Sequence, residues 1–326
     1  MVQNCEPVQV AGEEMIQFTA AIPTYNGGSG YLSKVLDALL KQKTSIKWEL
    51  IVVDNNSKDD TKKLILKYKT KFKVPLRYVF EKQQGAAYAR QRAVEEAKGQ
   101  LVGFLDDDVV PASNWIDEAY RFGLRHPEAG AWGGQVHGKY EVEPPKGFER
   151  IAPFLAITER GNNEMIYLPS KKLLPPSASL VVKKNVWLKN VPKRLVITGI
   201  NKINRATGED IEALLNIQNS GWEIWYDPKM KSWHQIPKQR LEKEYLIKLA
   251  NGIGITLHYI RMLRYKKWQR PFFTTAGVAN DIWKLATYYR KHRKTIKTDI
   301  VSACEFEFLK SRLKSQFYFL KRQFEK

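Results

Sequence analysis

Leu101-Val102-Gly103-Phe104-Leu105-Asp106-Asp107-Asp108 is the stretch that decides both the fold and the candidate site. Its first five residues are mostly apolar, which predicts a buried strand, and three carboxylates follow that strand directly. In open α/β sheets, ligands bind beyond the carboxyl ends of the strands. Three adjacent like charges repel one another unless a cation or solvent relieves them. The stretch therefore indicates either a metal–diphosphate site, with Mg²⁺ or Mn²⁺ bound by carboxylate oxygens, or a solvated acidic turn.

Strand and helix patterns alternate through the first hundred residues. The predicted strands are 17–22, 48–53, 76–80 and 101–105, and the predicted helices are 31–41, 58–69 and 86–97. This alternation is typical of a Rossmann-like, mostly parallel, doubly wound α/β sheet. The polar loops after the first, second and fourth strands then share one edge of the sheet. We therefore expect residues 23–26, Asp54 and residues 106–108 to converge there.

The pattern is less regular beyond Pro111. Residues 141–176 are rich in Pro and Gly and are expected to form a mobile loop over the site, and residues 193–207 a second loop. The other expected elements are a helix capped by Ser113 and running to Arg125, strands at 131–140 and 178–183, a short helix from Asn185, a helix around 211–217, and an edge strand at 222–226 before Asp227-Pro228.

Composition places the chain among globular proteins of a reducing compartment. It has 326 residues, 43% of them hydrophobic, which is enough for one large or two modest domains. The two cysteines, Cys5 and Cys304, lie near opposite ends of the chain. Residues 1–16 lack the features of a signal peptide, and no uncharged apolar run reaches the roughly 18 residues that span a bilayer. We therefore expect a cytoplasmic protein.

The net charge of +20 is concentrated in the last third of the chain. Residues 1–228 contain 31 Lys and Arg against 27 Asp and Glu, whereas residues 229–326 contain 23 against 7. Lys and Arg alternate there with Trp, Tyr and Phe, and a last helix is predicted from Asp299. This composition favours a peripheral membrane surface, such as the inner face of the plasma membrane, as the partner. The alternative is a helical annex that packs on the sheet and exposes its basic face to solvent.

A nucleotide is the ligand that the first loops suggest. Asp54 follows Gly28 by 26 residues, but Gly-x-Gly-x-x-Gly is not completed because position 33 is serine, which argues against a dinucleotide fold. A nucleoside-diphosphate donor explains more, because Asp54 can accept from the base while Gly85 and Arg90 approach the phosphates. From spacing alone, a salt bridge on a helix face explains Arg90 equally well, and Asp54 can be an ordinary turn residue.

Five motifs in the right order resemble those of family 2 glycosyltransferases of the GT-A fold. They lie at residues 21–26, 51–57, 84–90, 104–108 and 208–210. Residues 175–182 and 233–237 are in addition similar to cyanobacterial hormogonium-polysaccharide glycosyltransferases. The resemblance implies a GT-A domain at 17–237, which follows a leader at 1–16. It leaves residues 238–326 as a basic, aromatic-rich helical extension.

The resemblance also implies a role for each matching residue. Asp54 contacts the nucleobase, usually uracil. Asp106 and Asp108 form the Asp-x-Asp motif, in which one carboxylate faces the ribose and one binds the metal, and Asp107 can share either role. Asp210 is the catalytic base, although an acid at a helix start is by itself most often a partner of the helix dipole. The other implied contacts to nucleotide or metal are Pro23, Thr24, Tyr25, Asn26, Gly85, Arg90 and His234.

Two departures from the family pattern qualify this picture. Asp54-Asn55-Asn56-Ser57 stands where Asp-Asp-Gly-Ser is usual, which leaves one acid fewer for the base. The Gln-x-x-Arg-Trp motif of processive synthases is not matched at residues 239–241, which argues for addition of a single sugar.

The implied reaction is an inverting, Mn²⁺- or Mg²⁺-dependent transfer in polysaccharide biosynthesis. The donor is a nucleotide sugar, with a UDP-sugar favoured and a GDP- or dTDP-sugar as the alternative. The acceptor is a hydroxyl of a glycan or a lipid-linked molecule. An alternative from another class is a basic protein that binds membrane or nucleic acid and uses its α/β domain only as a scaffold. For the glycosyltransferase, no nucleic acid is expected as a partner. A nucleotidyltransferase usually has a Gly-rich loop bearing Lys or Arg after the first strand, and this chain lacks one.

Overall fold

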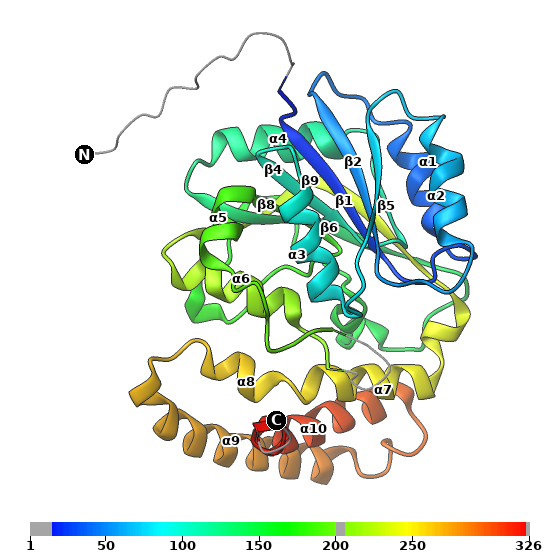
Figure 1. Cartoon of the computed structure of the whole chain (residues 1–326). Helices are drawn as coiled ribbons and strands as arrows, with labels where there is room; N and C mark the ends of the chain where they lie inside the picture. Colours follow the sequence, from blue (N-terminus) through cyan, green and yellow to red (C-terminus); the bar gives the residue numbers. More distant parts are fainter. Residues whose placement is uncertain (1–14, 200–205, 324–326) are drawn as a thin grey trace.

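The computed structural model of the chain describes residues 15–199 and 206–323, so Cys5 and nearly all of the predicted leader lie outside it. The strands of this part form one mixed sheet in the order β3-β2-β1-β4-β8-β6-β9-β5, and β7 pairs with β9 (Figure 1). The strands are β1 (Phe18–Thr24), β2 (Trp48–Asp54), β3 (Leu76–Phe80), β4 (Leu101–Leu105), β5 (Val109–Pro111), β6 (Ala129–Tyr140), β7 (Met165–Ile166), β8 (Ser179–Lys183) and β9 (Glu223–Ile236).

Helices cover both faces of the sheet and form a separate layer at its lower side in Figure 1. The α-helices are α1 (Leu32–Leu39), α2 (Thr61–Lys69), α3 (Ala86–Glu96), α4 (Trp115–Arg125), α5 (Lys184–Asn190), α6 (Glu209–Asn219), α7 (Lys243–Gly254), α8 (Leu257–Met262), α9 (Arg270–His292) and α10 (Ile300–Gln323). Short 3₁₀ helices are η1 (Phe148–Arg150), η2 (Ala152–Leu155), η3 (Pro169–Lys171), η4 (Lys238–Leu241) and η5 (Lys267–Gln269).

The parallel half of the sheet was predicted from the sequence and is confirmed. β1 pairs in parallel with β2 and β4, and β2 pairs in parallel with β3. Successive side chains of a strand point to opposite faces. In β2, Leu50 and Val52 therefore join the core formed with α1, α2 and α4, whereas Ile51 and Val53 join the core formed with α3, α5 and α6. Strands buried on both faces need such continuous apolar runs.

The prediction of a short edge strand at 222–226 was wrong. β9 runs on to Ile236 and lies between β6 and β5. Asp227-Pro228, which was expected to end the strand, is accommodated by a shift in register against β6. Such a bulge bends a strand without ending it. The longer strand matters for the site, because it places His234 opposite Val109, the residue after the three aspartates.

One of the two helix starts predicted from capping residues is confirmed. The α4 helix begins at Trp115 with Asn114 in the N-cap position and no side-chain cap, so the prediction of Ser113 as the cap was wrong. The helix predicted from Asp299 does start there, because its carboxylate accepts a hydrogen bond from the Ser302 N–H group at 2.7 Å.

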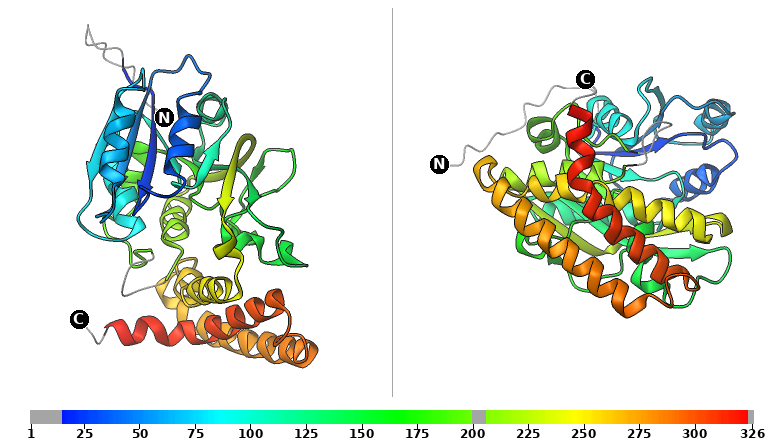
Figure 2. Two further views of the ribbon diagram at one scale, coloured as in Figure 1. Left: turned by 90° about the vertical axis from the view of Figure 1, so that its right-hand side faces the viewer. Right: turned by 90° about the horizontal axis from the view of Figure 1, so that it is seen from below.

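The four C-terminal helices form a layer below the sheet, as both views of Figure 2 show. An apolar core joins α7 and α10 of this layer to η1 and η2. Buried Asp281 of α9 connects three helices, because its carboxylate pairs with Arg261 of α8 at 3.0 Å and with Arg312 of α10. Among the residues that the structure describes, no helix has both the length and the apolarity to cross a bilayer.

Asp227 of β9 is a buried carboxylate with an incomplete set of partners. The Lys229 N–H group donates to Oδ1 at 2.9 Å, but no donor in the described part of the chain reaches Oδ2. Burial, assisted by the charges of Glu164 and Glu118, raises the pKa of Asp227 to about 6. The unfolded chain releases this proton near pH 4, so the free energy of unfolding falls as the pH rises from about 4 to about 6 and stays low above that.

We predict that Asp227→Asn, which cannot ionise, raises the free energy of unfolding by about 1–3 kcal/mol near pH 7.5 and changes it little near pH 4. Urea unfolding at the two pH values measures the difference. The exposed Asp60→Asn serves as the matched control and should alter neither value. A variant at position 227 that is less stable than the wild type near pH 7.5 contradicts the prediction.

Candidate active site

The polar loops that were predicted to converge do meet at the carboxyl ends of neighbouring strands. Thr24 ends β1 and lies beside Asp54, which ends β2. Asp106, Asp107 and Asp108 follow β4, the strand on the other side of β1. Thr24 Oγ1 donates a hydrogen bond to Asp107. The three segments therefore form one rim of the sheet.

Asp54 is buried and held in place by two donors. Its Oδ2 accepts a hydrogen bond from Tyr78 Oη at 2.8 Å, and its Oδ1 accepts one from the Ser57 N–H group at 2.9 Å. Burial and the hydrogen bond to Asp54 raise the pKa of Tyr78 to about 12, so the phenol keeps its proton and donates. Each carboxylate oxygen can accept a further hydrogen bond. Sequence reasoning missed Tyr78, whose one signal was its position on the neighbouring predicted strand.

Asn55 links the rim to the start of α3. Its side-chain amide donates to the Gln83 carbonyl oxygen at 2.6 Å, and its Oδ1 accepts from the Gly85 N–H group at 2.7 Å. An amide can donate and accept at the same time, whereas a carboxylate can only accept. Asn55 stands where the family usually has a second acid, and its hydrogen bonds require a side chain that both donates and accepts.

Gly85 allows a close approach that no other residue would permit. Its φ is +144°, and a Cβ atom there would lie 2.5 Å from the carbonyl oxygen of Thr198. The segment that ends at residue 199 therefore packs tightly on the start of α3. Because the N–H group of Gly85 already donates to Asn55, its contact with phosphates stays a prediction.

Residues 23–26 form the end of β1 and the turn that follows. Asn26 has a φ of 55°, a left-handed conformation that Asn adopts more readily than most residues. Its Oδ1 accepts a hydrogen bond from the Lys58 N–H group at 2.8 Å, which ties this turn to the loop after β2. Tyr25 is 42% exposed, so its ring is accessible at the rim.

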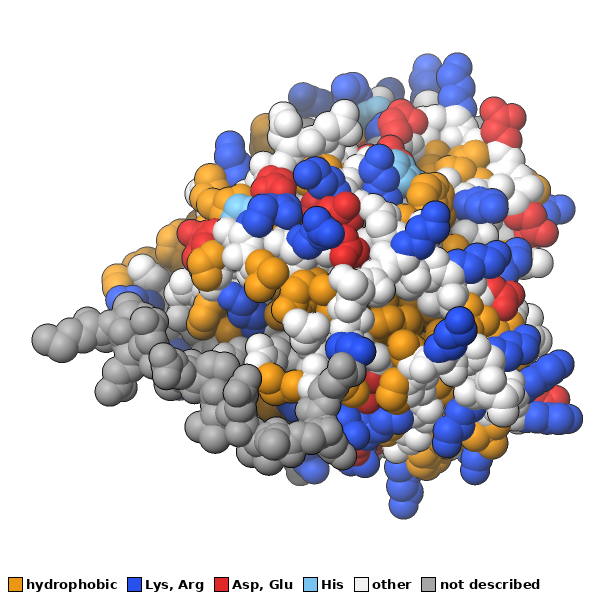
Figure 3. All heavy atoms as spheres, turned by 90° about the horizontal axis from the view of Figure 1, so that it is seen from above, with side chains coloured by type: hydrophobic (Ala, Val, Ile, Leu, Met, Phe, Trp, Pro, Cys, Tyr) orange, Lys and Arg blue, Asp and Glu red, His pale blue; other side chains and the backbone are white. Residues whose placement is uncertain are grey.

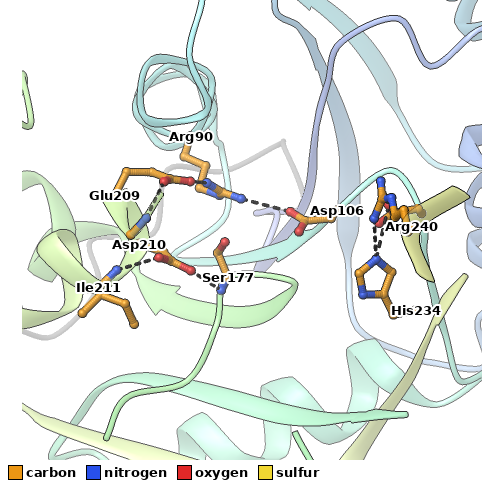
Figure 4. Close-up of polar contacts among 10 residues, drawn as sticks. Arg90, Asp106, Ser177, Glu209, Asp210, Ile211, His234 and Arg240 are labelled. Atoms are coloured by element: carbon orange, nitrogen blue, oxygen red, sulfur yellow. Dashed lines mark hydrogen bonds and ion pairs between the residues drawn. The ribbon is translucent and has the colours of Figure 1, made fainter. Parts of the chain in front are cut away.

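Arg90 is the centre of a buried ion-pair chain that joins the end of β4 to α6 (Figure 4). Its Nη2 lies 3.0 Å from Asp106 Oδ1, and its Nη1 lies 2.6 Å from Glu209 Oε1. Burial disfavours the charge of Arg90, but attraction to Asp106, Glu209 and Asp210 outweighs burial and raises its pKa. The helix-face salt bridge considered for Arg90 is not what the structure contains, because both partners lie outside α3. Glu209 was noticed in the sequence only as an acid at a helix start.

Asp108, His234 and Arg240 form a second charged cluster, of which Figure 4 labels His234 and Arg240. Asp108 Oδ2 lies 2.7 Å from Arg240 Nη2 and 3.3 Å from His234 Nε2. Burial opposes ionisation of Asp108, but His234 and Arg240 outweigh it and lower the pKa of Asp108 to about 2. His234 Nδ1 lies 2.8 Å from the Leu155 carbonyl oxygen, to which it donates, and this contact orients the ring. Sequence reasoning missed Arg240, which it met only as part of an unmatched motif.

The three aspartates carry more negative charge than their protein partners neutralise. Burial and the charges of Asp108 and Asp106 raise the pKa of Asp107 to about 7. Burial likewise raises the pKa of Asp106. A hard divalent cation relieves such repulsion, and carboxylate oxygens are its preferred ligands. These side chains fit the predicted cation, although no three or more His, Cys, Asp or Glu of the described residues form a preassembled metal site.

A pocket of about 280 Å³ brings Asp106 and Asp210 together. Arg90 and Glu209 line it between them. Asp210 lies in the first turn of α6, where its Oδ2 accepts a hydrogen bond from the Ser177 N–H group at 2.9 Å (Figure 4). Its Oδ1 accepts a second bond, at 2.8 Å, from the N–H group of the next residue. Two backbone donors therefore hold this carboxylate at the pocket.

Both loops expected near the site contribute to the pocket. Ala156 and Pro176 belong to the first loop and line it, although this stretch also contains β7 and the short helices η1 to η3. The mobility of that loop stays a prediction. Thr207 lines the pocket from the second loop, of which residues 200–205 lie outside the described part of the chain.

Residues 19–179 match the family described as Glycosyl transferase family 2. This domain belongs to glycosyltransferase family 2. A relative is the glycosyltransferase AglE of Haloferax volcanii, 28% identical over 51% of this chain and 52% of its own length. Another is the poly(ribitol-phosphate) β-N-acetylglucosaminyltransferase TarS of Staphylococcus aureus, 28% identical over 47% of this chain and 26% of its own length. The chain therefore spans about half, or less, of the length of these curated relatives.

Two solved structures share the fold of this chain. The mannosyltransferase PcManGT of Pyrobaculum calidifontis, in complex with GDP-Man and Mn²⁺, matches with a TM-score of 0.59 and 19% identity, over 95% of this chain and 90% of its own. Residues 1–349 of TarS in complex with UDP match with a TM-score of 0.51 and 15% identity, over 94% and 91%. The predicted GT-A fold is thus confirmed. The narrower resemblance to hormogonium-polysaccharide enzymes stays a prediction.

We predict that removing Arg90 alone costs more stability than removing an ion pair. Arg90→Met leaves Asp106 and Glu209 without their cation and should lower the free energy of unfolding by about 3–5 kcal/mol. The double variant Arg90→Met/Glu209→Met should recover at least about 1 kcal/mol of that loss, because apolar side chains replace the more buried pair. Guanidinium chloride unfolding measures both changes. Arg92→Met, which removes a partly exposed i,i+4 pair, is the control and should cost below about 1 kcal/mol. A double variant less stable than Arg90→Met contradicts the prediction.

Proposed function

We propose that the protein is an inverting, metal-dependent glycosyltransferase that moves a sugar from a nucleoside-diphosphate sugar to a hydroxyl of a glycan or lipid-linked acceptor. The observation that carries the proposal is the single pocket lined by both Asp106 and Asp210. Asp106 lies where open α/β sheets bind their ligands. Asp210 is a carboxylate that can take a proton from an acceptor. A donor sugar between them has its leaving group toward one aspartate and its attacking hydroxyl toward the other.

On the donor side, the rim of the sheet binds the nucleotide. Asp54 accepts a hydrogen bond from the nucleobase, and Arg90 attracts the diphosphate. Asp106 and Asp108 would hold the Mn²⁺ or Mg²⁺ ion, with His234 beside them. An ion bound there would neutralise charge on the departing nucleoside diphosphate and so stabilise the transition state by several kcal/mol. The proposed nucleotide contacts are Pro23, Thr24, Tyr25, Asn26, Asp54, Gly85, Arg90, Asp106 and Asp107.

On the acceptor side, Asp210 acts as the general base. It takes the proton of the acceptor hydroxyl while that oxygen forms a bond to the anomeric carbon of the donor sugar. The bond between that carbon and the phosphate oxygen breaks, and its electron pair leaves with the nucleoside diphosphate. Attack from the opposite face inverts the anomeric configuration. General-base help of this kind contributes about 10²–10⁴-fold to the rate. Glu209, the other carboxylate at this helix start, is instead engaged in the ion pair with Arg90.

A UDP-sugar is the proposed donor, and the acceptor is proposed to belong to polysaccharide biosynthesis. The TarS structure that shares the fold is a complex with UDP, and its curated name describes transfer to poly(ribitol-phosphate). A GDP-sugar is the alternative, since PcManGT binds GDP-Man. A dTDP-sugar has no support among these relatives.

We predict that Asp210→Asn nearly abolishes sugar transfer and leaves nucleotide affinity unchanged. The amide keeps the shape of the side chain but cannot take the proton. Release of nucleoside diphosphate in the presence of acceptor measures the rate, and calorimetry measures the affinity. Asp117→Asn is the matched control, because Asp117 also lies in the first turn of a helix but is remote from the pocket. A residual rate above about a tenth of the wild-type value would exclude Asp210 as the base, given the expected contribution of about 10²–10⁴-fold.

We further predict that Asp108→Asn removes the effect of the metal on nucleotide binding. Calorimetric titration of UDP and of GDP, each with and without Mn²⁺, measures it. In the wild type, Mn²⁺ should strengthen binding of the correct nucleotide by roughly tenfold or more, because a cation held by these carboxylates would attract the diphosphate. In the variant, the two affinities should coincide while circular dichroism shows a folded protein. An undiminished Mn²⁺ effect would overturn the assignment of Asp108.

A further inference from the structure

The exposed side of α9 is apolar and aromatic, although most surface helices turn such residues toward a core. We define the α9 surface by five exposed large side chains, which are Trp268 of η5 and Phe272, Ile282, Trp283 and Tyr289 of α9. Phe272 is 71% exposed and Trp283 is 63% exposed. They lie eleven residues apart, about three helical turns, and so share one face of the helix. The buried residue of α9 is Asp281, on the side that meets α8 and α10.

The chain around the α9 surface is strongly basic. Residues 266–297 contain nine Lys and Arg and a single acid, Asp281, whose charge is neutralised inside the layer. Exposed cations gather where the helix ends, at Arg290, Lys291, Arg293 and Lys294. On the opposite face of the molecule, by contrast, Lys and Arg are spread among Asp and Glu (Figure 3). The positive charge of this segment, in which Asp281 is the single acid, therefore coincides with the exposed aromatic rings.

A basic pocket also opens between α9 and α10. Its volume is about 340 Å³, and its lining includes Lys284, Lys291 and His292 together with Tyr288 and Leu309. Seen from below, α9 and α10 are the elements that form the outer side of the C-terminal layer (Figure 2, right). The helix that carries the apolar anchors therefore also lines a hollow with cationic side chains.

We propose that the α9 surface docks the protein on an anionic lipid bilayer, with α9 lying in the plane of the interface. Aromatic rings favour the headgroup level of a bilayer, and neighbouring Lys and Arg are attracted to anionic headgroups. A nucleic acid would account for the cations and for stacking on the rings. It would not account for the aliphatic members of the exposed face, Ile282, Ala276 and Ala279, which gain only from apolar surroundings.

The contacts of the C-terminal layer explain how docking would serve the pocket. The Thr207 N–H group donates to the Gly252 carbonyl oxygen of α7 at 3.3 Å, and Thr256 Oγ1 donates to the Thr207 carbonyl oxygen at 2.8 Å. Tyr259 Oη of α8 donates to Glu212 of α6 at 2.7 Å. The helix that carries Asp210 is therefore bonded to the layer whose outer side is α9. The docking proposal itself does not depend on the transfer reaction.

The test is sedimentation of the full chain with sucrose-loaded vesicles, without any nucleotide. We expect strong binding to phosphatidylcholine vesicles that contain phosphatidylglycerol and weak binding to phosphatidylcholine alone. Phe272→Ser/Trp283→Ser should lower the affinity for the anionic vesicles by about tenfold or more, because it removes two interfacial anchors. The matched control is Leu66→Ser/Leu124→Ser, which removes two exposed apolar residues from the sheet domain and should bind as the wild type does.

A second pair of variants tests the charge. Arg290→Glu/Lys294→Glu should lower the affinity for anionic vesicles by about tenfold or more, and added salt should weaken the wild type in the same direction. Lys63→Glu/Lys67→Glu is the control, since it reverses two exposed charges of α2 at the same spacing. Thermal unfolding of each variant establishes that the layer is intact.

Three results would overturn the proposal. One is wild-type binding that is absent, or equal for the two vesicle types. Another is a Phe272→Ser/Trp283→Ser variant that is folded and binds anionic vesicles as tightly as its Leu66/Leu124 control. The third is binding of RNA or duplex DNA that competes with the vesicles at lower concentration and that Arg290→Glu/Lys294→Glu abolishes, which would identify a nucleic acid as the partner.

Discussion

A single buried guanidinium connects the two sides of the candidate site. Asp106 follows β4 and Glu209 opens α6, and the buried carboxylate of Glu209 would be strongly destabilised without the cation between them. Arg90 supplies that cation from α3, 119 residues before Glu209. Since Asp210 is the neighbour of Glu209, the ion-pair chain also sets where the proposed base stands relative to the strand end. The first turn of α6 favours its carboxylates as well, because backbone N–H groups are unpaired at a helix start.

The three aspartates at the rim of the sheet are not equally neutralised by cationic side chains. Arg240 and His234 neutralise Asp108, whereas Asp107 has no cation of its own within bonding distance among the described side chains and shares the charge of its neighbours. A metal ion that used Asp108 would compete with Arg240 for the same oxygen. The Arg240 side chain is 32% exposed, so it can turn toward solvent or toward a phosphate when the ion takes its place.

Much of the fold was predictable because its signals are local. The strands that become β1 to β4 are apolar runs bounded by turn residues, and the carboxylates after β4 follow from the sequence alone. What could not be predicted depends on distant pairing. Nothing near Asp227-Pro228 reveals that β6 provides a partner whose shifted register lets β9 continue. His234 and Arg240 reach Asp108 only because of that continuation. The sequence alone therefore did not reveal that these three residues form one cluster. Arg90 was a candidate, but its two partners come from elements that only the folded chain brings together.

Hydrogen bonds connect the C-terminal helices to residues at the pocket. Thr207, which lines the pocket, is held from both its N–H and its carbonyl group by residues at the junction of α7 and α8. From α8, Arg261 reaches the buried carboxylate of Asp281, and through it α9. These links connect the outer face of the layer to the start of α6. If α9 lies on a bilayer, the height of the pocket above the lipid surface is therefore set by the protein, which suits an acceptor whose own anchor is in the membrane.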